Sequence, residues 1–302
     1  MRNDVVVVMS TYNGEKYVER QLDSIFCQKD VDITVVVRDD HSIDNTVSTI
    51  KHYKERTGNK IILIEGENEG YAKSFWDTLC MAPESSYYAF SDQDDVWKED
   101  KLIKSISALN NNELLPQLAY CRMTRTDPTF VELVEQVRVL KPSELNKKLV
   151  LTQTFNYGAA TVINNSARKL ICRWFPSSPL VPHDTWIGLL CYWFGKVHYI
   201  DESLYYWIRY QNSVTGEGTK HSGMKYRIKE TLKGNSYMNV ASDIINNYED
   251  VLSEEDREFL NKLMNYKTNF RSKIQLLCDK DFKRSSFMGS LILKLGILTN
   301  KF

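Results

Sequence analysis

The first hundred residues alternate short runs of β-branched residues with longer segments whose apolar residues recur at helical spacing. The short runs are apolar throughout, as in strands that are buried on both faces. This alternation predicts an α/β fold with a parallel sheet covered by helices on both sides. The predicted strands are Val5–Met9, Ile33–Val37, Ile61–Ile64 and Tyr87–Phe90, and the predicted helices are Tyr17–Phe26, Asp44–Tyr53 and Tyr71–Met81.

The rest of the chain divides into three parts. Residues 110–154 are less regular and contain three prolines. A second apolar region follows to residue 214, and from Ser222 onward the pattern is helical and charged. In the last segment, 282–302, one helical stripe carries Phe287, Leu291, Leu295 and Leu298, with basic residues around it. That segment is too short to span a bilayer, and it is interpreted either as a helix on an anionic membrane surface or as a helix packed on the protein.

Composition narrows the partners and the compartment. Basic and acidic residues each total 39, so there is no overall basic field to attract nucleic acid, and none is expected as a partner. The apolar run after Met1 is much shorter than the core of a signal peptide, which predicts a cytoplasmic protein. Six scattered cysteines have no zinc-site spacing and are predicted to be reduced and mostly buried: Cys27, Cys80, Cys121, Cys172, Cys191 and Cys278.

Polar residues follow each predicted strand, at the sheet edge where open α/β folds bind ligands. The fourth strand runs into Asp92, Asp94 and Asp95, whose mutual repulsion a bound cation would relieve. Mg²⁺ or Mn²⁺ often uses only one or two carboxylates, with substrate phosphates as further ligands. This cluster therefore predicts a divalent-cation and diphosphate site, the alternative being a solvated turn or helix cap.

Two further loops carry candidate binding groups. Asp39 and Asp40 follow the second strand, where a carboxylate can accept hydrogen bonds from a ribose or a base. The loop Asn68–Gly70 can offer backbone N–H groups to phosphate, and Lys73 a cation. Taken alone, such a loop is more often a simple turn.

A second constellation lies at His183 and Asp184, before an apolar segment that continues through Trp193. A carboxylate at the mouth of an apolar element is suited to act as the general base for a sugar hydroxyl. The alternative is an N-cap for the helix predicted over Trp186–Phe194, and one helix start can serve both purposes.

These motifs together resemble the family 2 glycosyltransferases, inverting enzymes of GT-A fold, and within them the bacterial rhamnosyltransferase-like branch. The resemblance covers about Val5 to Gly216. It implies a GT-A domain over residues 1–216, with a Rossmann-like, mainly parallel sheet, and a helical C-terminal region over 217–302. It rests on the segments Met9–Glu15, Arg38–Asp40, Ser91–Trp97 and His183–Asp184.

The resemblance also implies residue roles. Asp184 matches the general base, and Asp94 with Asp92 matches the ligands of a Mn²⁺ or Mg²⁺ cofactor. The implied nucleotide-binding residues are Thr11, Tyr12, Asn13, Asp39, Asp40, Asn68, Gly70, Lys73 and Asp92. The implied contacts to the donor or acceptor sugar are Gly158, His183, Trp186 and Arg209, and the irregular region 110–154 is expected to form part of the acceptor side.

The implied activity is metal-dependent, inverting transfer of rhamnose or a hexose from dTDP-rhamnose or a UDP-hexose to a glycan in bacterial surface polysaccharide synthesis. The acceptor is expected to be lipid-linked, with the enzyme cytoplasmic or peripheral on the inner face of the membrane. A non-catalytic sugar-nucleotide or glycan-binding partner subunit is the alternative. Three positions depart from the family pattern: His41 stands where glycine is usual, and Ile208 and Tyr210 stand where arginine and histidine are usual.

Overall fold

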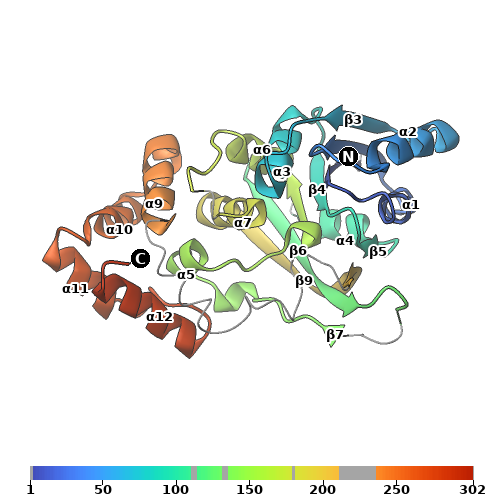
Figure 1. Cartoon of the computed structure of the whole chain (residues 1–302). Coiled ribbons are helices and arrows are strands. Elements are labelled where there is room, and N and C mark those ends of the chain that lie inside the picture. The colour runs from blue at the N-terminus through green and yellow to red at the C-terminus, as the bar shows by residue number, and fades with distance from the viewer. Residues whose placement is uncertain (1–2, 110–113, 131–134, 179–180, 211–235, 302) are drawn as a thin grey trace.

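The structure is a computed structural model that describes residues 3–109, 114–130, 135–178, 181–210 and 236–301. The predicted α/β alternation of the first hundred residues is confirmed (Figure 1). Its elements are β1 (Asp4–Thr11), α1 (Val18–Phe26), β2 (Asp32–Asp39), α2 (Thr46–Thr57), β3 (Ile61–Glu65), α3 (Tyr71–Met81), β4 (Tyr87–Ser91), β5 (Val96–Trp97) and α4 (Lys101–Ala108).

The described strands form one mixed sheet in the order β3-β2-β1-β4-β8-β6-β9-β5, with β7 paired to β6. The pairs β3–β2, β2–β1 and β1–β4 are parallel. From Val5 to Met9, β1 is almost completely buried, because helices cover both faces of the sheet. The register sets Thr11 opposite Asp39 and Met9 opposite Ser91, so the polar segments that follow β1, β2 and β4 begin at one edge of the sheet.

The second half of the sheet contains long strands that the sequence did not indicate. β6 and β9 pair in parallel across register shifts near Cys121 and Arg122, and β8 lies antiparallel between β4 and β6. The elements are β6 (Gln117–Thr126), β7 (Glu135–Gln136), the 3₁₀ helix η1 (Pro142–Glu144), α5 (Lys147–Thr152), the 3₁₀ helix η2 (Gly158–Ala160), β8 (Thr161–Asn164), α6 (Asn165–Ile171), α7 (His183–Phe194) and β9 (Lys196–Ile208).

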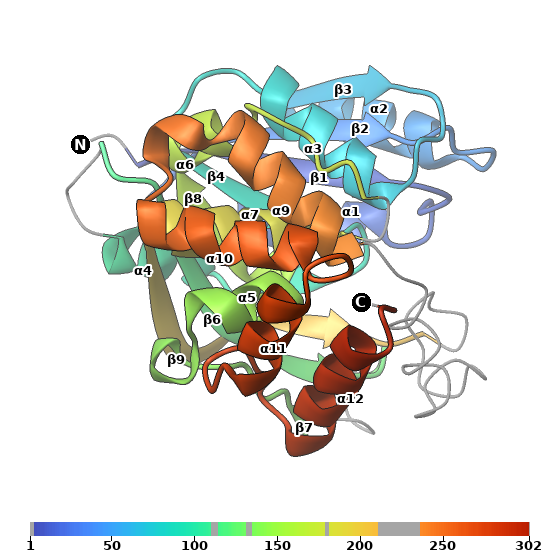
Figure 2. The ribbon, with the colours of Figure 1, turned by 90° about the vertical axis from the view of Figure 1, so that its left-hand side faces the viewer.

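The C-terminal region is helical, as predicted. Figure 2 shows these helices stacked beside the sheet domain, next to α5. They are α9 (Ser236–Asn247), the 3₁₀ helix η3 (Glu249–Val251), α10 (Glu254–Asn265), α11 (Phe270–Cys278) and α12 (Phe287–Leu298). The predicted boundary at residue 216 lies outside the described residues. In the part of the chain that the structure describes, no helix has both the length and the apolar character needed to cross a bilayer.

The prediction of six reduced, mostly buried cysteines is wrong. Cys80 and Cys172 form a disulfide with a Cα–Cα distance of 5.6 Å. Of the four free cysteines, Cys121 and Cys191 are buried whereas Cys27 and Cys278 are exposed. Spacing along the chain gave no hint of the pair because its partners are 92 residues apart and meet only when α3 packs beside α6.

Candidate active site

The ends of β1 and β2 are joined through Asp39. Its carboxylate accepts hydrogen bonds from the Thr11 hydroxyl at 2.9 Å and from the backbone N–H and hydroxyl of Ser42 at 2.7 and 2.6 Å. All three residues lie at the sheet edge where nucleotide binding is predicted. His41 makes the turn to Ser42 with a positive φ of 68°, a conformation that is uncommon for a residue other than glycine.

Asp40 has a structural role that the sequence did not reveal. Its carboxylate pairs with the buried Arg38 guanidinium at 2.6 Å and accepts the backbone N–H groups of Glu69 and Gly70 at 3.0 and 2.9 Å. These are N–H groups that the Asn68–Gly70 loop was predicted to offer to phosphate. Asn68 itself is exposed.

Lys73, predicted to contact phosphate, is held on its own helix. Its ammonium group lies 2.6 and 2.7 Å from the two carboxylate oxygens of Asp77, one turn further along α3. The same group lies over the rings of Trp76 and Phe175. In this arrangement the ammonium group of Lys73 is paired with Asp77 and packed against the two rings.

Gln93 clamps the loop after β1 to the loop after β4, a contact that the sequence did not indicate. Its side-chain carbonyl accepts the Tyr12 N–H at 2.9 Å and its amide donates to the Tyr12 carbonyl at 3.0 Å. A Cβ at Gly14 would lie 2.2 Å from the same side-chain carbonyl, so a larger residue there would displace the Gln93 amide from this position. Asn13, with φ 49°, links this loop to the Ser42–Ile43 turn through two further hydrogen bonds.

The charges of two other carboxylates, one of them from a distant part of the chain, act on Asp92. Burial raises the pKa of Asp92, and the charges of Asp94 and Asp184 raise it further, to about 7. Desolvation and then the charges of Asp184 and Asp92 raise the pKa of the Tyr71 hydroxyl, and the charge of Asp184 also acts on Tyr157. Asp184 therefore belongs to the same site as the cluster that follows β4.

Asp184 lies in the first turn of α7, and the residue at the N-cap is Pro182. One carboxylate oxygen, Oδ1, accepts the Thr185 N–H at 2.7 Å, and the Asn156 amide donates to the Asp184 carbonyl at 3.2 Å. Among the described residues, no hydrogen bond reaches its Oδ2. Asp184 is half-buried, so an oxygen held at the start of a rigid helix is available to a substrate proton.

Two arginines face Asp94. Burial raises the pKa of Asp94, while the charges of Arg20 and Arg209 lower it. The Arg20 guanidinium donates to the Asp94 carbonyl at 3.2 Å and to the Tyr210 hydroxyl, and Tyr210 packs on Tyr17 with ring centroids 4.2 Å apart. Positive charge thus reaches the site although Ile208, at the usual arginine position, is buried.

His183 is packed among aromatic rings. Its ring stacks on Phe75 with centroids 4.1 Å apart, and burial lowers its pKa. A Cβ at Gly158 would lie 2.6 Å from His183 Nε2, so this glycine makes room for the imidazole. Neither ring nitrogen has a hydrogen-bond partner among the described residues.

Trp186 lies away from the predicted sugar site. Its side chain is 1% exposed, its indole N–H donates to the Trp174 carbonyl at 3.0 Å, and its ring packs on Tyr248. In a helix, a residue two positions after Asp184 points to the other side, which here is the core.

The residues present fit a divalent cation. Among the described residues, no group of three or more histidine, cysteine or acidic side chains converges as a complete metal site. Mg²⁺ and Mn²⁺ do not need one when a substrate diphosphate supplies further oxygens. Burial raises the pKa of Asp92 most, and the charge of the neighbouring Asp94 raises it further; a bound cation relieves repulsion of this second kind.

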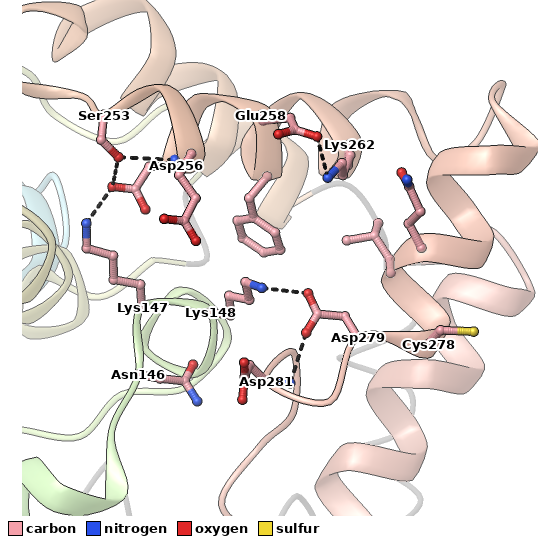
Figure 3. A pocket seen from close by; sticks show the side chains of 14 residues that line it. Asn146, Lys147, Lys148, Ser253, Asp256, Glu258, Lys262, Cys278, Asp279 and Asp281 are labelled. Carbon is pink, nitrogen blue, oxygen red and sulfur yellow. Dashed lines mark hydrogen bonds and ion pairs between the residues drawn. The ribbon is translucent and has the colours of Figure 1, made fainter.

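A solvent-open cavity of about 760 Å³ lies elsewhere, between α5 and the helices α10 and α11 (Figure 3). Lys147 on its wall accepts the indole N–H of Trp193 through its carbonyl. Trp193 is nine residues from Asp184 along α7, about 14 Å at the rise of an α-helix. Charged side chains that line this cavity form ion pairs with one another, such as Lys148–Asp279 at 2.7 Å. Asp92, Asp94 and Asp184 are not among the residues that line it.

The chain is similar to known proteins in sequence and in fold. The dTDP-rhamnosyl transferase RfbG of Shigella flexneri is 38% identical over 105 residues, which span 33% of this chain and only 36% of that protein. The structure of TarS from S. aureus in complex with UDP has a TM-score of 0.57 at 18% identity, covering 93% of this chain and 76% of that one. The mannosyltransferase PcManGT from Pyrobaculum calidifontis, in complex with GDP-Man and Mn²⁺, has a TM-score of 0.56 at 16% identity, covering 100% and 81%.

At these identities the two structures show a shared fold, which confirms the predicted fold class. The family model described as Glycosyl transferase family 2 matches residues 6–170, more than half of the chain. The chain therefore belongs to glycosyl transferase family 2.

Proposed function

We propose that this chain is an inverting glycosyltransferase that moves a sugar from a nucleotide diphosphate donor to a glycan hydroxyl, with residues 1–216 as the transferase domain. The observation that carries the proposal is electrostatic: the charges of Asp94 and Asp184 both act on Asp92, although Asp184 is 92 positions away in the sequence. Shared electrostatics of this kind are typical of active sites.

The positions of the charged residues support a role for each of them. Asp184 accepts the proton of the acceptor hydroxyl while that oxygen attacks the anomeric carbon and the nucleotide diphosphate leaves from the opposite face. Asp92 and Asp94 would hold a Mn²⁺ or Mg²⁺ ion, which when bound supplies positive charge to the leaving diphosphate. Arg20 and Arg209, whose charges act on Asp94, add to the positive field at that end of the site.

The substrates are proposed from chemistry and likeness together. Likeness to a dTDP-rhamnosyl transferase supports dTDP-rhamnose, and the UDP complex of a neighbour of the same fold supports a UDP-hexose. The acceptor is a lipid-linked glycan for bacterial surface polysaccharide, met at the cytoplasmic face of the membrane. A partner subunit that binds sugar nucleotides without turnover is favoured only by the unusual Ile208 and Tyr210.

The decisive experiment is the substitution Asp184→Asn, assayed by nucleotide diphosphate release from a panel of nucleotide sugars with membrane lipid extracts as acceptors. Loss of the base should lower transfer by about 10²–10⁴-fold while donor affinity is kept. The matched control is Glu254→Gln, which changes an exposed first-turn acid on α10 and should leave turnover unchanged. An active Asp184→Asn protein would remove the assignment, and donor binding without acceptor-dependent release by the unmodified chain would favour the binding subunit.

The cation is tested by chelation. EDTA should abolish acceptor-dependent diphosphate release, and added Mn²⁺ or Mg²⁺ should restore it, because the repulsion around Asp92 is otherwise unrelieved when a diphosphate enters. EDTA loaded beforehand with excess Mn²⁺ controls for other effects of the chelator. Turnover that persists in EDTA after dialysis contradicts the metal proposal.

A further inference from the structure

The last helix, α12, has two apolar faces. Leu293 and Ile297 are completely buried against the protein. At about 100° per residue, the stripe of Phe287, Leu291 and Leu298 lies on the opposite side of the helix. That stripe is left in solvent: the exposed fractions of Phe287, Met288, Leu291, Leu295 and Leu298 are 84%, 44%, 51%, 48% and 58%.

The expectation of a helix packed on the protein is met by the buried face, and the exposed face is the one that the membrane interpretation concerns. The buried face packs α12 on the protein, and α11 beside it adds two more exposed apolar side chains, Phe270 and Ile274. Figures 1 and 2 both show α12 at the outer edge of the C-terminal helices. An apolar strip of this size on a surface helix marks an interaction surface.

The basic residues around the apolar strip of α12 indicate which kind of surface it binds. The chain as a whole is neutral, yet residues 267–302 carry eight basic and two acidic residues, a net of +6 that leaves −6 on the remainder. No acidic residue occurs from Phe282 to the end of the chain, and exposed lysines, Lys283 and Lys301, lie before and after α12. Basic residues at the borders of an apolar strip complement an anionic lipid surface.

We infer that the exposed face of α12 is a docking surface for an anionic bilayer. Its 12 residues extend about 18 Å, well short of the hydrocarbon core, so the helix lies in the plane of the interface. A second copy of the chain is a poorer occupant, because a two-fold contact through α12 would bring two regions of net charge +6 together.

The start of α12 is bonded to the segment that supports the candidate base. The Gln153 amide donates to the Ser285 hydroxyl at 2.7 Å, and the Ser285 N–H donates to the Gln153 side-chain carbonyl at 3.0 Å. One residue later, the Thr154 hydroxyl bonds that of Thr185, next to Asp184. Resting on the proposed function, this link places the acceptor side of the site beside the lipid surface that would carry a lipid-linked glycan.

The test is flotation of the full chain with vesicles of phosphatidylcholine alone or of phosphatidylcholine mixed with phosphatidylglycerol. The unmodified chain should float with the mixed vesicles and not with phosphatidylcholine alone. Leu291→Ser with Leu295→Ser should lower the partition coefficient by about tenfold or more, because two apolar side chains are lost from the contact. Lys283→Glu with Lys301→Glu should lower it as well, and more at low salt than at high salt.

The matched controls make the same kinds of substitution at exposed positions away from α12. Ile62→Ser with Val251→Ser replaces two apolar side chains of 43% and 44% exposure, and Lys54→Glu with Lys196→Glu makes the same charge change. Neither control should alter flotation. Failure of the unmodified chain to float, or unchanged flotation of the leucine variant, overturns the inference.

Sedimentation without lipid distinguishes membrane binding from self-association. If the unmodified chain is a dimer and the leucine variant is a monomer, the strip binds a second copy of the chain and the inference is overturned. Failure here is also distinct from failure of the proposed function. Donor hydrolysis or transfer to a soluble acceptor, measured without vesicles, does not depend on the α12 face and should be the same in all of these variants.

Discussion

Single side chains join the loops of the candidate site. Gln93 bonds both backbone groups of Tyr12, and Asp39 bonds Thr11 and Ser42, so the loops after β1, β2 and β4 form one unit. Gly14 completes this unit because it leaves room for the Gln93 amide. The exposed Tyr12 is held by its backbone, which keeps its ring free to lie against a base.

The clamp predicts a non-additive pair of substitutions. Gly14→Ala should push the Gln93 side chain away from Tyr12, and Gln93→Ala should delete the same contact, so each should raise the KM for the donor several-fold. The double variant should be no worse than the poorer single variant, since both remove one interaction. Donor KM and thermal unfolding are measured for all four proteins, and fully additive losses would show that Gly14 and Gln93 act separately.

At the scale of elements, the end of β2 is tied to the start of α3. Asp40 draws together Arg38 of β2 and the N–H groups of Glu69 and Gly70, and Glu69 also pairs with Arg38 at 2.9 Å. The N-terminus of α3 is therefore set by a buried ion pair, and α3 in turn carries Tyr71 and Phe75 to the site. Asp40 therefore also affects the site through the position of α3.

Asp40→Asn is expected to cost about 3–5 kcal/mol of unfolding free energy, because it removes the buried one of the two carboxylates that pair with the Arg38 guanidinium. The control is Asp32→Asn, which removes an exposed ion pair to Lys60 at 2.8 Å on the same strand and should cost less than about 1 kcal/mol. Chemical denaturation provides both values. A stability loss no larger than that of the control, combined with a large loss of donor affinity, would show that Asp40 acts mainly in nucleotide binding.

Sequence reasoning located the strands whose apolar runs are continuous and the polar residues directly after them, because both signals are local. It missed β6 and β9, in which residues such as Arg122 and Glu202 interrupt the apolar pattern and pairing across a register shift decides the structure. It could not tell that Lys73 is paired within α3 or that Trp186 points into the core. The positions of such side chains are determined by packing between segments that lie far apart in the sequence.

The whole molecule is held together by links between its two halves. Lys147 and Lys148 of α5 pair with Asp256 and Asp279 of the C-terminal region, both at or below 2.7 Å (Figure 3). Within the sheet domain, the Cys80–Cys172 disulfide joins the end of α3 to the end of α6. α3 carries residues of the candidate site, and α6 precedes α7, which carries Asp184. The disulfide therefore restricts how far these two parts of the site can move apart.

The disulfide makes a prediction that depends on redox state. Closing 92 residues of chain restricts the unfolded state, so without reductant the wild type should exceed the Cys80→Ser, Cys172→Ser double variant by about 2–4 kcal/mol in unfolding free energy. In dithiothreitol, as in a reducing cytosol, the difference should shrink to the small cost of the serines.

Thiol titration of the denatured wild type should find the four free cysteines before reduction and all six after it. Serine in place of the exposed Cys27 and Cys278 is the control and should change stability equally in both buffers. Equal stability of wild type and double variant without reductant, or six thiols before reduction, would mean that the pair stays as two thiols and that packing alone holds α3 against α6.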